Sequence, residues 1–168
     1  MIEFNLKDRR MRLIDDVFYA RAIIGGQETK KETWYKVSFH ETDFGYIRCS
    51  LKLDGRVMKL VQHRMVWFAH HQDWDIWDNS SGNQIDHKNK DKKDNRLCNL
   101  RVATQSENEQ NKNSKGYYMD KHGKFQAKII INGKYKYIGY YGTEEEAHEA
   151  YLAEKRILHP FFVENEEL

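Results

Sequence analysis

Apolar and polar residues alternate through part of the first half of the chain in a way that predicts a β-hairpin. Between Gly45 and Val61, apolar side chains recur at every second position and are interrupted by the pair Asp54-Gly55. Residues two apart share one face of a strand, and an Asp-Gly pair suits the central positions of a tight turn. His63 follows and opens a predicted helix. The buried face of the hairpin is expected to consist of Ile47, Cys49, Leu51 and Leu53.

A second strand and a helix start are predicted near the middle of the chain. Apolar Leu100 and Val102 precede the spacing Thr104-x-x-Glu107, which is typical of a capping box. In that motif the Thr hydroxyl accepts a hydrogen bond from a backbone N–H of the first turn, and the Glu side chain reaches back to the cap. The spacing therefore places Asn108 in the first turn of a helix.

The last third of the chain has the pattern of three strands and one helix. Strands are predicted over Tyr117–Asp120, Lys124–Ile131 and Lys134–Tyr141, and Asn132-Gly133 suits the tight turn between the last two. Thr143 is expected to cap a helix with glutamates in its first turn. The apolar stripe of that helix is predicted as Ala147, Ala150, Tyr151 and Leu158. The strand residues that should pack on it are Phe125, Ala127, Ile129 and Ile131.

Composition narrows the class of protein. Of 168 residues, 39% are hydrophobic and 32% are charged, and the mean hydropathy is −0.91. No apolar run approaches the roughly 20 residues of a membrane span, and no signal peptide pattern is visible. Cys49 and Cys98 form no C-x-x-C pair, so we expect no structural zinc and reduced thiols in a cytoplasmic setting.

Positive charge is concentrated in one segment. The whole chain is +2, but residues 111 to 143 hold seven lysines against one acid, Asp120, which gives net +6. A basic sheet interleaved with Tyr117, Tyr135 and Tyr137 suits DNA phosphates and base edges. For any single lysine, a solvated surface position is the simpler interpretation.

The pair Asp86-His87, followed by Asn99 and Asn108, has the composition of a small metal site. Hard oxygen ligands suit Mg²⁺ or Mn²⁺, and a neutral imidazole can take a proton near neutral pH. Adjacent strand residues point to opposite faces, so Asp86 and His87 must sit at a strand end or a bulge.

The alternative interpretation of this stretch is a polar hairpin without chemistry. Asn and Asp in loops usually bond to their own backbone. We prefer that interpretation for Asp94 and Asn95, but not for the four residues named above taken together.

The stretch resembles the HNH endonucleases, most closely those of bacteriophage introns and intergenic regions, with the pattern DHxNxDxxDNRxxNLRxxTxxxN. The positions that match without a gap are Asp86, His87, Asn89, Asp91, Asp94, Asn95, Arg96, Asn99, Leu100, Arg101, Thr104 and Asn108. The resemblance extends upstream over Gly45 to His71. It implies an α+β fold with a ββα-metal nuclease domain that cuts DNA to 5′-phosphate and 3′-hydroxyl ends using one Mg²⁺ or Mn²⁺ ion.

The resemblance also implies roles for individual residues. His87 would be the general base, and Asn99 would hydrogen-bond so that His87 keeps its orientation. Asp86 and Asn108 would hold the cation; many relatives have a His in place of Asn108, so the chain is an H-N-N variant with oxygen ligands. DNA contacts are expected from Arg96 and Arg101.

Residues 114 to 159 resemble the APETALA-type, or ethylene-response-factor, DNA-binding domain, which lays a three-stranded sheet in the major groove. The shared features are the turn before Phe125, the Asn-Gly-Lys hairpin and the IGYYGTEEEA junction. Lys136 departs from the family, which usually has an apolar residue there, and must snorkel if the register is right. The resemblance and the charge together predict DNA contacts from Lys124, Gln126, Lys128, Lys134, Tyr135 and Tyr137. Gln126 and Lys128 replace arginines that are common in the family, which weakens the case for bidentate guanine recognition.

The predicted organisation is an N-terminal extension (1–32), an HNH nuclease domain (33–112), an APETALA-type domain (113–160) and an acidic tail (161–168), which is expected to be solvated from Glu164. We expect a homing endonuclease that acts on double-stranded DNA as a monomer or dimer in a bacterial cytoplasm, encoded by a phage or mobile element, and that nicks by default. Protein partners are not predicted. Two alternatives stay open: a restriction-type or degradative HNH nuclease, and a non-cleaving DNA-binding regulator.

Overall fold

The computed structural model describes residues 1–24 and 26–164. The chain forms two compact units, residues 1–103 and 104–168, and each unit is described by itself. No helix in the described part of the chain is long and apolar enough to cross a membrane.

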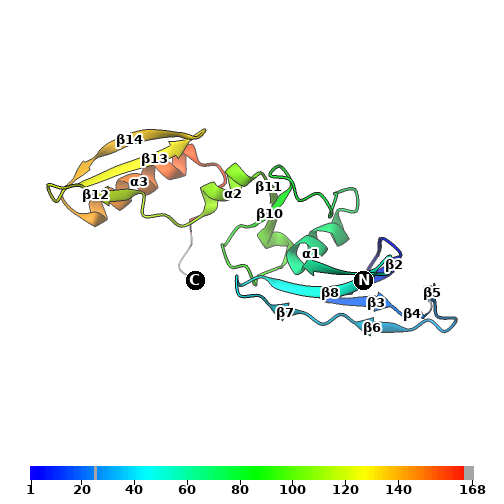
Figure 1. The fold of residues 1–168 in the computed structure, drawn as a ribbon. Helices are drawn as coiled ribbons and strands as arrows, with labels where there is room; N and C mark the ends of the chain where they lie inside the picture. Colours follow the sequence, from blue (N-terminus) through cyan, green and yellow to red (C-terminus); the bar gives the residue numbers. More distant parts are fainter. Residues whose placement is uncertain (25, 165–168) are drawn as a thin grey trace. The chain divides into compact units, whose positions relative to one another are not determined.

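The first unit begins with an antiparallel sheet in the strand order β1-β2-β3-β6 (Figure 1). Its strands are β1 (Ile2–Leu6), β2 (Arg9–Ile14), β3 (Val17–Arg21) and β6 (Trp34–Lys36), and a small hairpin of β4 (Ile23–Ile24) and β5 (Gln27–Glu28) precedes β6. The inner face is buried and apolar and comprises Phe4, Leu6, Met11, Leu13, Phe18 and Ala20. Residues 1–32, expected as an extension, therefore supply a large share of the core of this unit.

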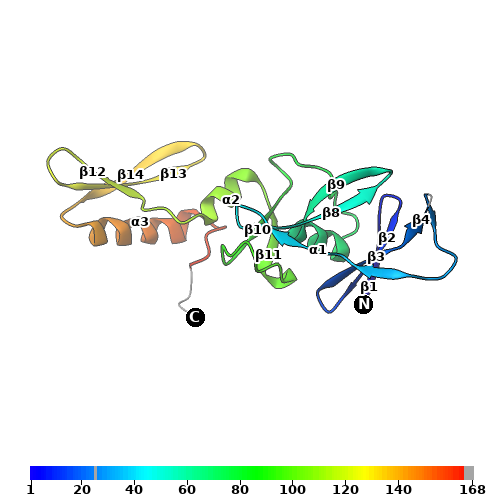
Figure 2. The ribbon, with the colours of Figure 1, turned by 60° about the horizontal axis from the view of Figure 1, so that its bottom comes forward.

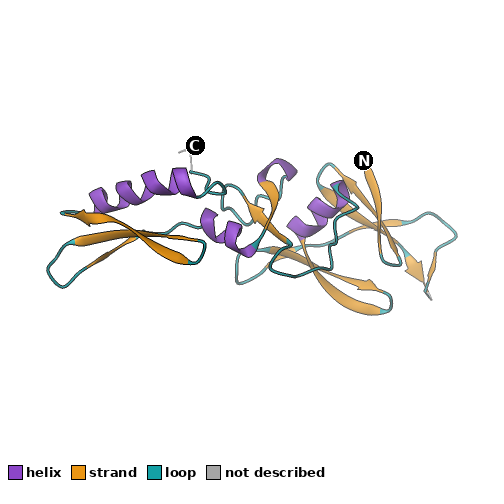
Figure 3. Ribbon diagram, turned by 90° about the horizontal axis from the view of Figure 1, so that it is seen from above, coloured by secondary structure: helices purple, strands orange, loops and turns teal. Residues whose placement is uncertain are grey.

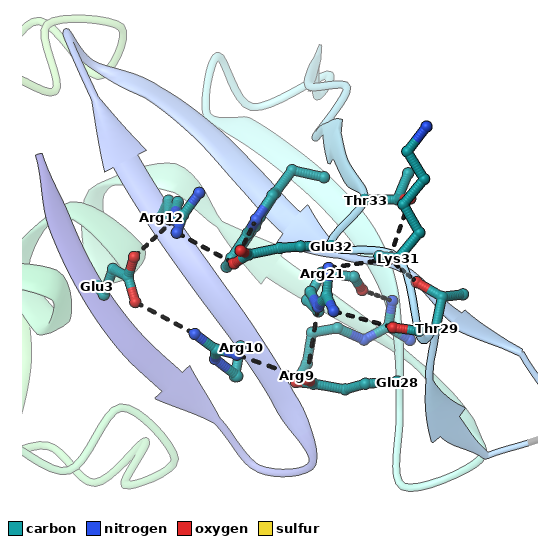
Figure 4. Close-up of polar contacts among 11 residues, drawn as sticks. Glu3, Arg9, Arg10, Arg12, Arg21, Glu28, Thr29, Lys31, Glu32 and Thr33 are labelled. Atoms are coloured by element: carbon teal, nitrogen blue, oxygen red, sulfur yellow. Dashed lines mark hydrogen bonds and ion pairs between the residues drawn. The ribbon is translucent and has the colours of Figure 1, made fainter.

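Arginines bind the outer face of this sheet to the segment before β6. Arg12 lies between Glu3 and Glu32 (Figure 4). Its guanidinium is also 3.9 Å from the centre of the Trp34 ring. Arg21 is buried, bonds to Glu28 and donates to the backbone carbonyl oxygens of residues 29 and 31. Because each of these arginines has an acidic partner, the face is nearly balanced in charge.

The predicted hairpin and helix are present. β8 (Ile47–Leu53) pairs with β7 (His40–Glu41) and β9 (Arg56–Val61), and α1 (Gln62–His70) packs against the hairpin (Figure 2). Asp54 and Gly55 have φ values of 46° and 75°, as the tight turn requires. On the inner face Cys49, Leu51 and Leu53 are buried and Ile47 is half-buried, so the predicted alternation is confirmed.

The last elements of the first unit are β10 (Gln84–His87), a 3₁₀ turn (Leu97–Asn99) and β11 (Leu100–Ala103). β10 and β11 form a two-stranded antiparallel sheet, in which Ile85, Leu100 and Ala103 are buried. The loop between them, residues 88–96, is polar and exposed for most of its length.

The second unit comprises α2 (Gln105–Asn111), a sheet in the order β12-β13-β14 and α3 (Glu144–Leu158), which lies along one face of that sheet (Figure 3). The strands are β12 (Tyr117–Met119), β13 (Phe125–Ile131) and β14 (Lys134–Tyr141). Both helices begin with a capping box, which was predicted at Thr104; at Thr143 only a cap was predicted. Ala147 and Tyr151 are buried as predicted, and Ala150 and Leu158 are half-buried.

The register of β14 explains how Lys136 is accommodated at a position where an apolar residue was expected. Lys128 pairs with Tyr137 and Ala127 pairs with Gly139, so Ile138 is the extra residue of a β-bulge. Lys136 lies opposite Ile129, on the α3 side, where its ammonium is 2.6 Å from a carboxylate oxygen of Glu154. The lysine thus snorkels to an acidic partner on the helix, which is one of the two outcomes expected for it.

The first residues of the predicted acidic tail, 161–163, contact both helices of the second unit. The backbone N–H of Val163 donates to Asn111 Oδ1 at 3.0 Å, and the Lys155 ammonium lies 4.4 Å from the centre of the Phe162 ring. Lys155 itself is buried and donates to the carbonyl oxygen of Lys112 at 2.7 Å. Residues 161–163 therefore pack within the second unit, while residues 165–168 of the predicted tail lie outside the described residues.

Candidate active site

The Asp86-His87 pair lies at the end of β10, which is one of the two positions that its adjacency allows. His87 is the last residue of the strand and pairs with Leu100, while Asp86 pairs with Arg101 across the two-stranded sheet. Both side chains are buried, with 6% of Asp86 and 5% of His87 exposed. A carboxylate and an imidazole are therefore presented next to each other from a fixed backbone position.

Arg101 holds the Asp86 carboxylate from the neighbouring strand. Its Nε and one terminal nitrogen donate to Asp86 Oδ2 at 2.9 and 2.7 Å. A buried carboxylate without a partner would be costly, so this charge-assisted pair both compensates and orients Asp86. Arg101 was expected to contact DNA, and in the structure its guanidinium bonds to Asp86.

Arg96 makes a similar pair with Asp94 in the loop between β10 and β11. Two guanidinium nitrogens donate to the two carboxylate oxygens at 2.7 and 2.6 Å. These hydrogen bonds lower the pKa of Asp94 to about 2. The Arg96 side chain is 71% exposed, so it remains accessible to a phosphate.

The His87 ring is held by a chain of two side-chain amides. His87 Nε2 is 3.0 Å from Asn95 Oδ1, and Asn95 Nδ2 donates to Gln62 Oε1 at 3.1 Å. Because an amide oxygen only accepts, this geometry puts the ring hydrogen on Nε2. The prediction that Asn95 serves only its own loop is wrong, and Gln62 was missed entirely.

Asn99 organises the loop that carries Asn95. Its side chain accepts from the backbone N–H of Asn89 at 3.0 Å and donates to Asn89 Oδ1 and to the carbonyl oxygen of Asp94 at 2.9 and 2.7 Å. Its own carbonyl oxygen accepts from the N–H of Lys88, the residue after His87. These contacts fix both ends of the 88–95 loop. Because Asn95 belongs to this loop and binds His87, they also help to hold the His87 ring in its orientation.

Two aromatic rings complete the surroundings of His87. The centre of the His63 ring lies 5.0 Å from that of His87 in an edge-to-face arrangement, and Tyr46 lies 5.4 Å from His63 and 6.3 Å from His87. Burial lowers the pKa of His63 to about 3, so this ring stays neutral. His63 is therefore a buried, uncharged neighbour of the His87 ring.

Asn108 lies on α2, which belongs to the second unit. Its backbone N–H donates to the carbonyl oxygen of Thr104, so it sits one turn into the helix, as the capping box predicts. Among the described residues, no group of three or more His, Cys, Asp or Glu side chains could hold a metal ion. Carboxylate and amide oxygens, as in Asp86 and Asn108, are hard ligands of the kind that suits Mg²⁺ or Mn²⁺.

The two cysteines lie in different environments. Cys49 is buried, and burial raises the pKa of its thiol to about 12. Cys98 is exposed, next to Asn99 in the 3₁₀ turn.

The sheet of the second unit carries an aromatic outer face, opposite α3. Tyr135, Tyr137 and Tyr140 are 68%, 55% and 52% exposed. Lys128 lies between two rings, with its ammonium 4.3 Å from the centre of Tyr135 and 4.8 Å from that of Tyr118. The tyrosines gather on one face because the bulge at Ile138 shifts the alternation of β14 by one residue.

The predicted basic character of this face needs correction. Lys134 and Lys136 lie opposite Ile131 and Ile129, on the α3 side, and Lys124 precedes β13. Tyr117, expected among the exposed tyrosines, instead donates its hydroxyl to Glu144 of α3 at 2.6 Å. Gln126 accepts from the Tyr118 hydroxyl on the outer face. Of the basic residues within β12, β13 and β14, it is thus Lys128 that lies on the outer face.

A comparison with known protein families gives a match to the centre of the chain. Residues 61–110 match the family model described as HNH endonuclease. Neither the curated proteins nor the solved structures contain a match. The matched segment includes Asp86, His87, Asn95, Asn99 and Asn108, and the chain is similar to the HNH endonucleases over that segment.

Proposed function

We propose that this protein is a metal-dependent endonuclease that hydrolyses phosphodiester bonds of double-stranded DNA. The observation that carries the proposal is the buried Asp86-His87 pair at the end of β10, with His87 Nε2 bound by Asn95. The match of residues 61–110 to an HNH endonuclease model supports it independently.

His87 acts as the general base in this proposal. Its Nδ1 accepts a proton from the attacking water, and the Asn95 oxygen then stabilises the charged ring through Nε2. Asn99 acts as a positioning residue, because it holds the loop that carries Asn95. His63 stays neutral beside the ring and excludes water from that side.

Asp86 and Asn108 would hold one Mg²⁺ or Mn²⁺ ion. When bound, such an ion stabilises charge on the phosphoryl oxygens and on the leaving 3′-oxygen. Arg101 keeps the carboxylate in one orientation, and the exposed Arg96 is available to a backbone phosphate. The products are a 5′-phosphate and a 3′-hydroxyl.

The sheet of the second unit acts as an APETALA-type DNA-binding module. Lys128, Gln126, Tyr135 and Tyr137 contact DNA from its outer face, and Lys124 and Lys134 contribute charge at the ends of the strands. A chain with one site cuts one strand per binding event, so the proposed activity is nicking by a homing-type endonuclease. A dimer would be needed to cut both strands in one event.

A plasmid assay tests the proposal. Supercoiled DNA is incubated with the protein in Mg²⁺, Mn²⁺ or EDTA, and nicks are counted before and after treatment with DNA ligase, which reseals only 5′-phosphate and 3′-hydroxyl ends. We expect metal-dependent, ligatable nicks, and a loss of about 10²- to 10⁴-fold in rate for His87→Ala. His122→Ala, in an exposed turn, is the matched control and should cut normally.

The same assay addresses the alternatives. Binding without cleavage in either metal would favour a DNA-binding regulator. Cleavage at many unrelated sequences would favour a degradative nuclease over a homing one. Wild-type rates in His87→Ala would refute the assignment of the base.

A further inference from the structure

Phe44 is the most exposed of the large hydrophobic side chains in the described part of the chain, at 80% exposure. It lies in the turn between β7 and β8. A single exposed apolar residue is ordinary on a protein surface. The case for Phe44 depends on how the turn is held and on what lies beside it.

The turn that carries Phe44 is closed by its own hydrogen bonds. The N–H of Gly45 donates to the carbonyl oxygen of Thr42 at 2.8 Å. The N–H of Thr42 donates to the carbonyl oxygen of Tyr46, also at 2.8 Å. The Thr42 hydroxyl accepts from the N–H of Tyr46, and Gly45 adopts a φ of 79°, which a side chain would strain. Phe44 is therefore displayed from a backbone with little freedom.

The turn is also fastened to the loop that follows His87. Lys92 donates to the carbonyl oxygen of Phe44 at 3.1 Å, and its ammonium lies 4.7 Å from the centre of the Tyr46 ring. Lys93 pairs with Glu41 at 2.9 Å. Tyr46 in turn contacts the rings of His63 and His87, so Phe44 has a fixed position relative to the proposed base.

The surroundings of the turn carry both signs of charge, with a small excess of cations. The loop after His87 contributes Lys88, Lys90, Lys92 and Lys93, against Asp91 in the loop and Glu41 and Asp43 in the turn, and Lys92 and Lys93 are exposed. An apolar ring that protrudes from a rigid turn beside lysines matches the wedges that proteins insert between base pairs, which unstack a step and kink the duplex.

We propose that Phe44 is such a wedge and inserts between base pairs of duplex DNA beside the phosphate that is cut. This proposal rests on the proposed function for its ligand. Insertion costs least at flexible pyrimidine–purine steps, so Phe44 also biases the choice of site. It contributes to specificity through the deformability of the DNA, without reading a base edge.

The test measures unstacking without cleavage and without a known site. Relaxed, closed circular plasmid is incubated with the full chain in EDTA, treated with a topoisomerase that needs no metal, and analysed for its change in linking number. Insertion between base pairs unwinds the helix and shifts the linking number in proportion to bound protein. A gel shift on the same plasmid gives the occupancy.

Wild-type protein and Phe44→Trp are expected to shift the linking number, and Phe44→Ala is expected to lose most of the shift at equal occupancy. Val57→Ala is the matched control, because Val57 is 72% exposed on β9, beside the turn at the opposite end of β8, and should behave as wild type. An unchanged shift in Phe44→Ala at equal occupancy would overturn the wedge and leave the proposed nuclease intact. Absence of any plasmid binding by the wild-type chain would instead overturn the proposed function.

Discussion

Replacing Asn95 by Ala removes the acceptor that binds His87 Nε2 at 3.0 Å. A hydrogen bond of this kind contributes about 0.5–1.5 kcal/mol net, so the nicking rate should fall by roughly 2- to 13-fold. This loss is much smaller than that of His87→Ala, because the base remains and only its tautomer and orientation are relaxed. Gln62→Ala should have a smaller effect, since it leaves the Asn95 oxygen in place.

Two measurements separate this role from a general loss of stability. Single-turnover nicking at saturating Mg²⁺ gives the rate, and ¹⁵N NMR of the imidazole gives the tautomer, which should be Nε2–H in wild type and mixed in Asn95→Ala. Asn95→Asp keeps an oxygen acceptor, so it should restore the tautomer while shifting the acid limb of the pH–rate profile to higher pH, because a carboxylate favours the protonated ring.

A double-mutant cycle provides the control for Asn95. Gln62→Ala should add nothing in the Asn95→Ala background, since both residues act through one chain of hydrogen bonds. Asn5→Ala, at an exposed position of β1, should leave both rate and spectrum unchanged. A wild-type rate and a single Nε2–H tautomer in Asn95→Ala would refute the proposed positioning.

Further predictions concern stability and DNA affinity. Burial lowers the pKa of His63 to about 3 from an ordinary value of 6.5, so the contribution of the neutral ring to stability is complete above pH 6.5 and is lost as the pH falls towards 3. Urea unfolding at several pH values gives the slope of the free energy of unfolding against pH, which should be smaller in His63→Phe by up to about 1.4 kcal/mol per pH unit in this window. Equal slopes in the two proteins would contradict the neutral ring. Gly116→Ala should lower the free energy of unfolding by about 2–4 kcal/mol in the same urea titration, because φ is 74° and the added Cβ would lie 1.9 Å from the Tyr151 ring. Gly123→Ala is the control: its φ is 75° but the space around it is open, so it should cost only about 1 kcal/mol. Tyr135→Ala and Tyr137→Ala should weaken binding to duplex DNA with little change in its salt dependence. Lys128→Ala should lower the slope of log affinity against log salt concentration by about one, as measured by titrating affinity at several salt concentrations. Equal slopes for all three variants would mean that Lys128 contacts no phosphate.

Local determinants explain what the sequence predicted well. The turns at Asp54-Gly55 and Asn132-Gly133 need positive φ, and both capping boxes are closed within four residues, so each signal lies beside the structure that it forms. Adjacency also limited Asp86 and His87 to a strand end or a bulge, and the structure has the strand end.

What the sequence did not predict depends on distant contacts. Asn95 reaches Gln62, 33 positions earlier, and no local pattern marks that pair. The burial of Lys155 depends on the carbonyl oxygen of Lys112, and the aromatic face depends on a bulge at Ile138 that an alternating pattern conceals. The role of residues 1–32 in the core was missed because the short strands alternate with charged turns.

The Asp86–Arg101 pair has a consequence for the protein when the proposed cation is removed. Structural zinc sites often hold a domain together, so a chelator unfolds it. Here the buried carboxylate is already neutralised by a guanidinium from the opposite strand, and the first unit has its own apolar core. We therefore expect EDTA to stop the reaction reversibly and leave the melting temperature almost unchanged, so that the supply of cation can switch the enzyme on and off repeatedly without a cycle of refolding.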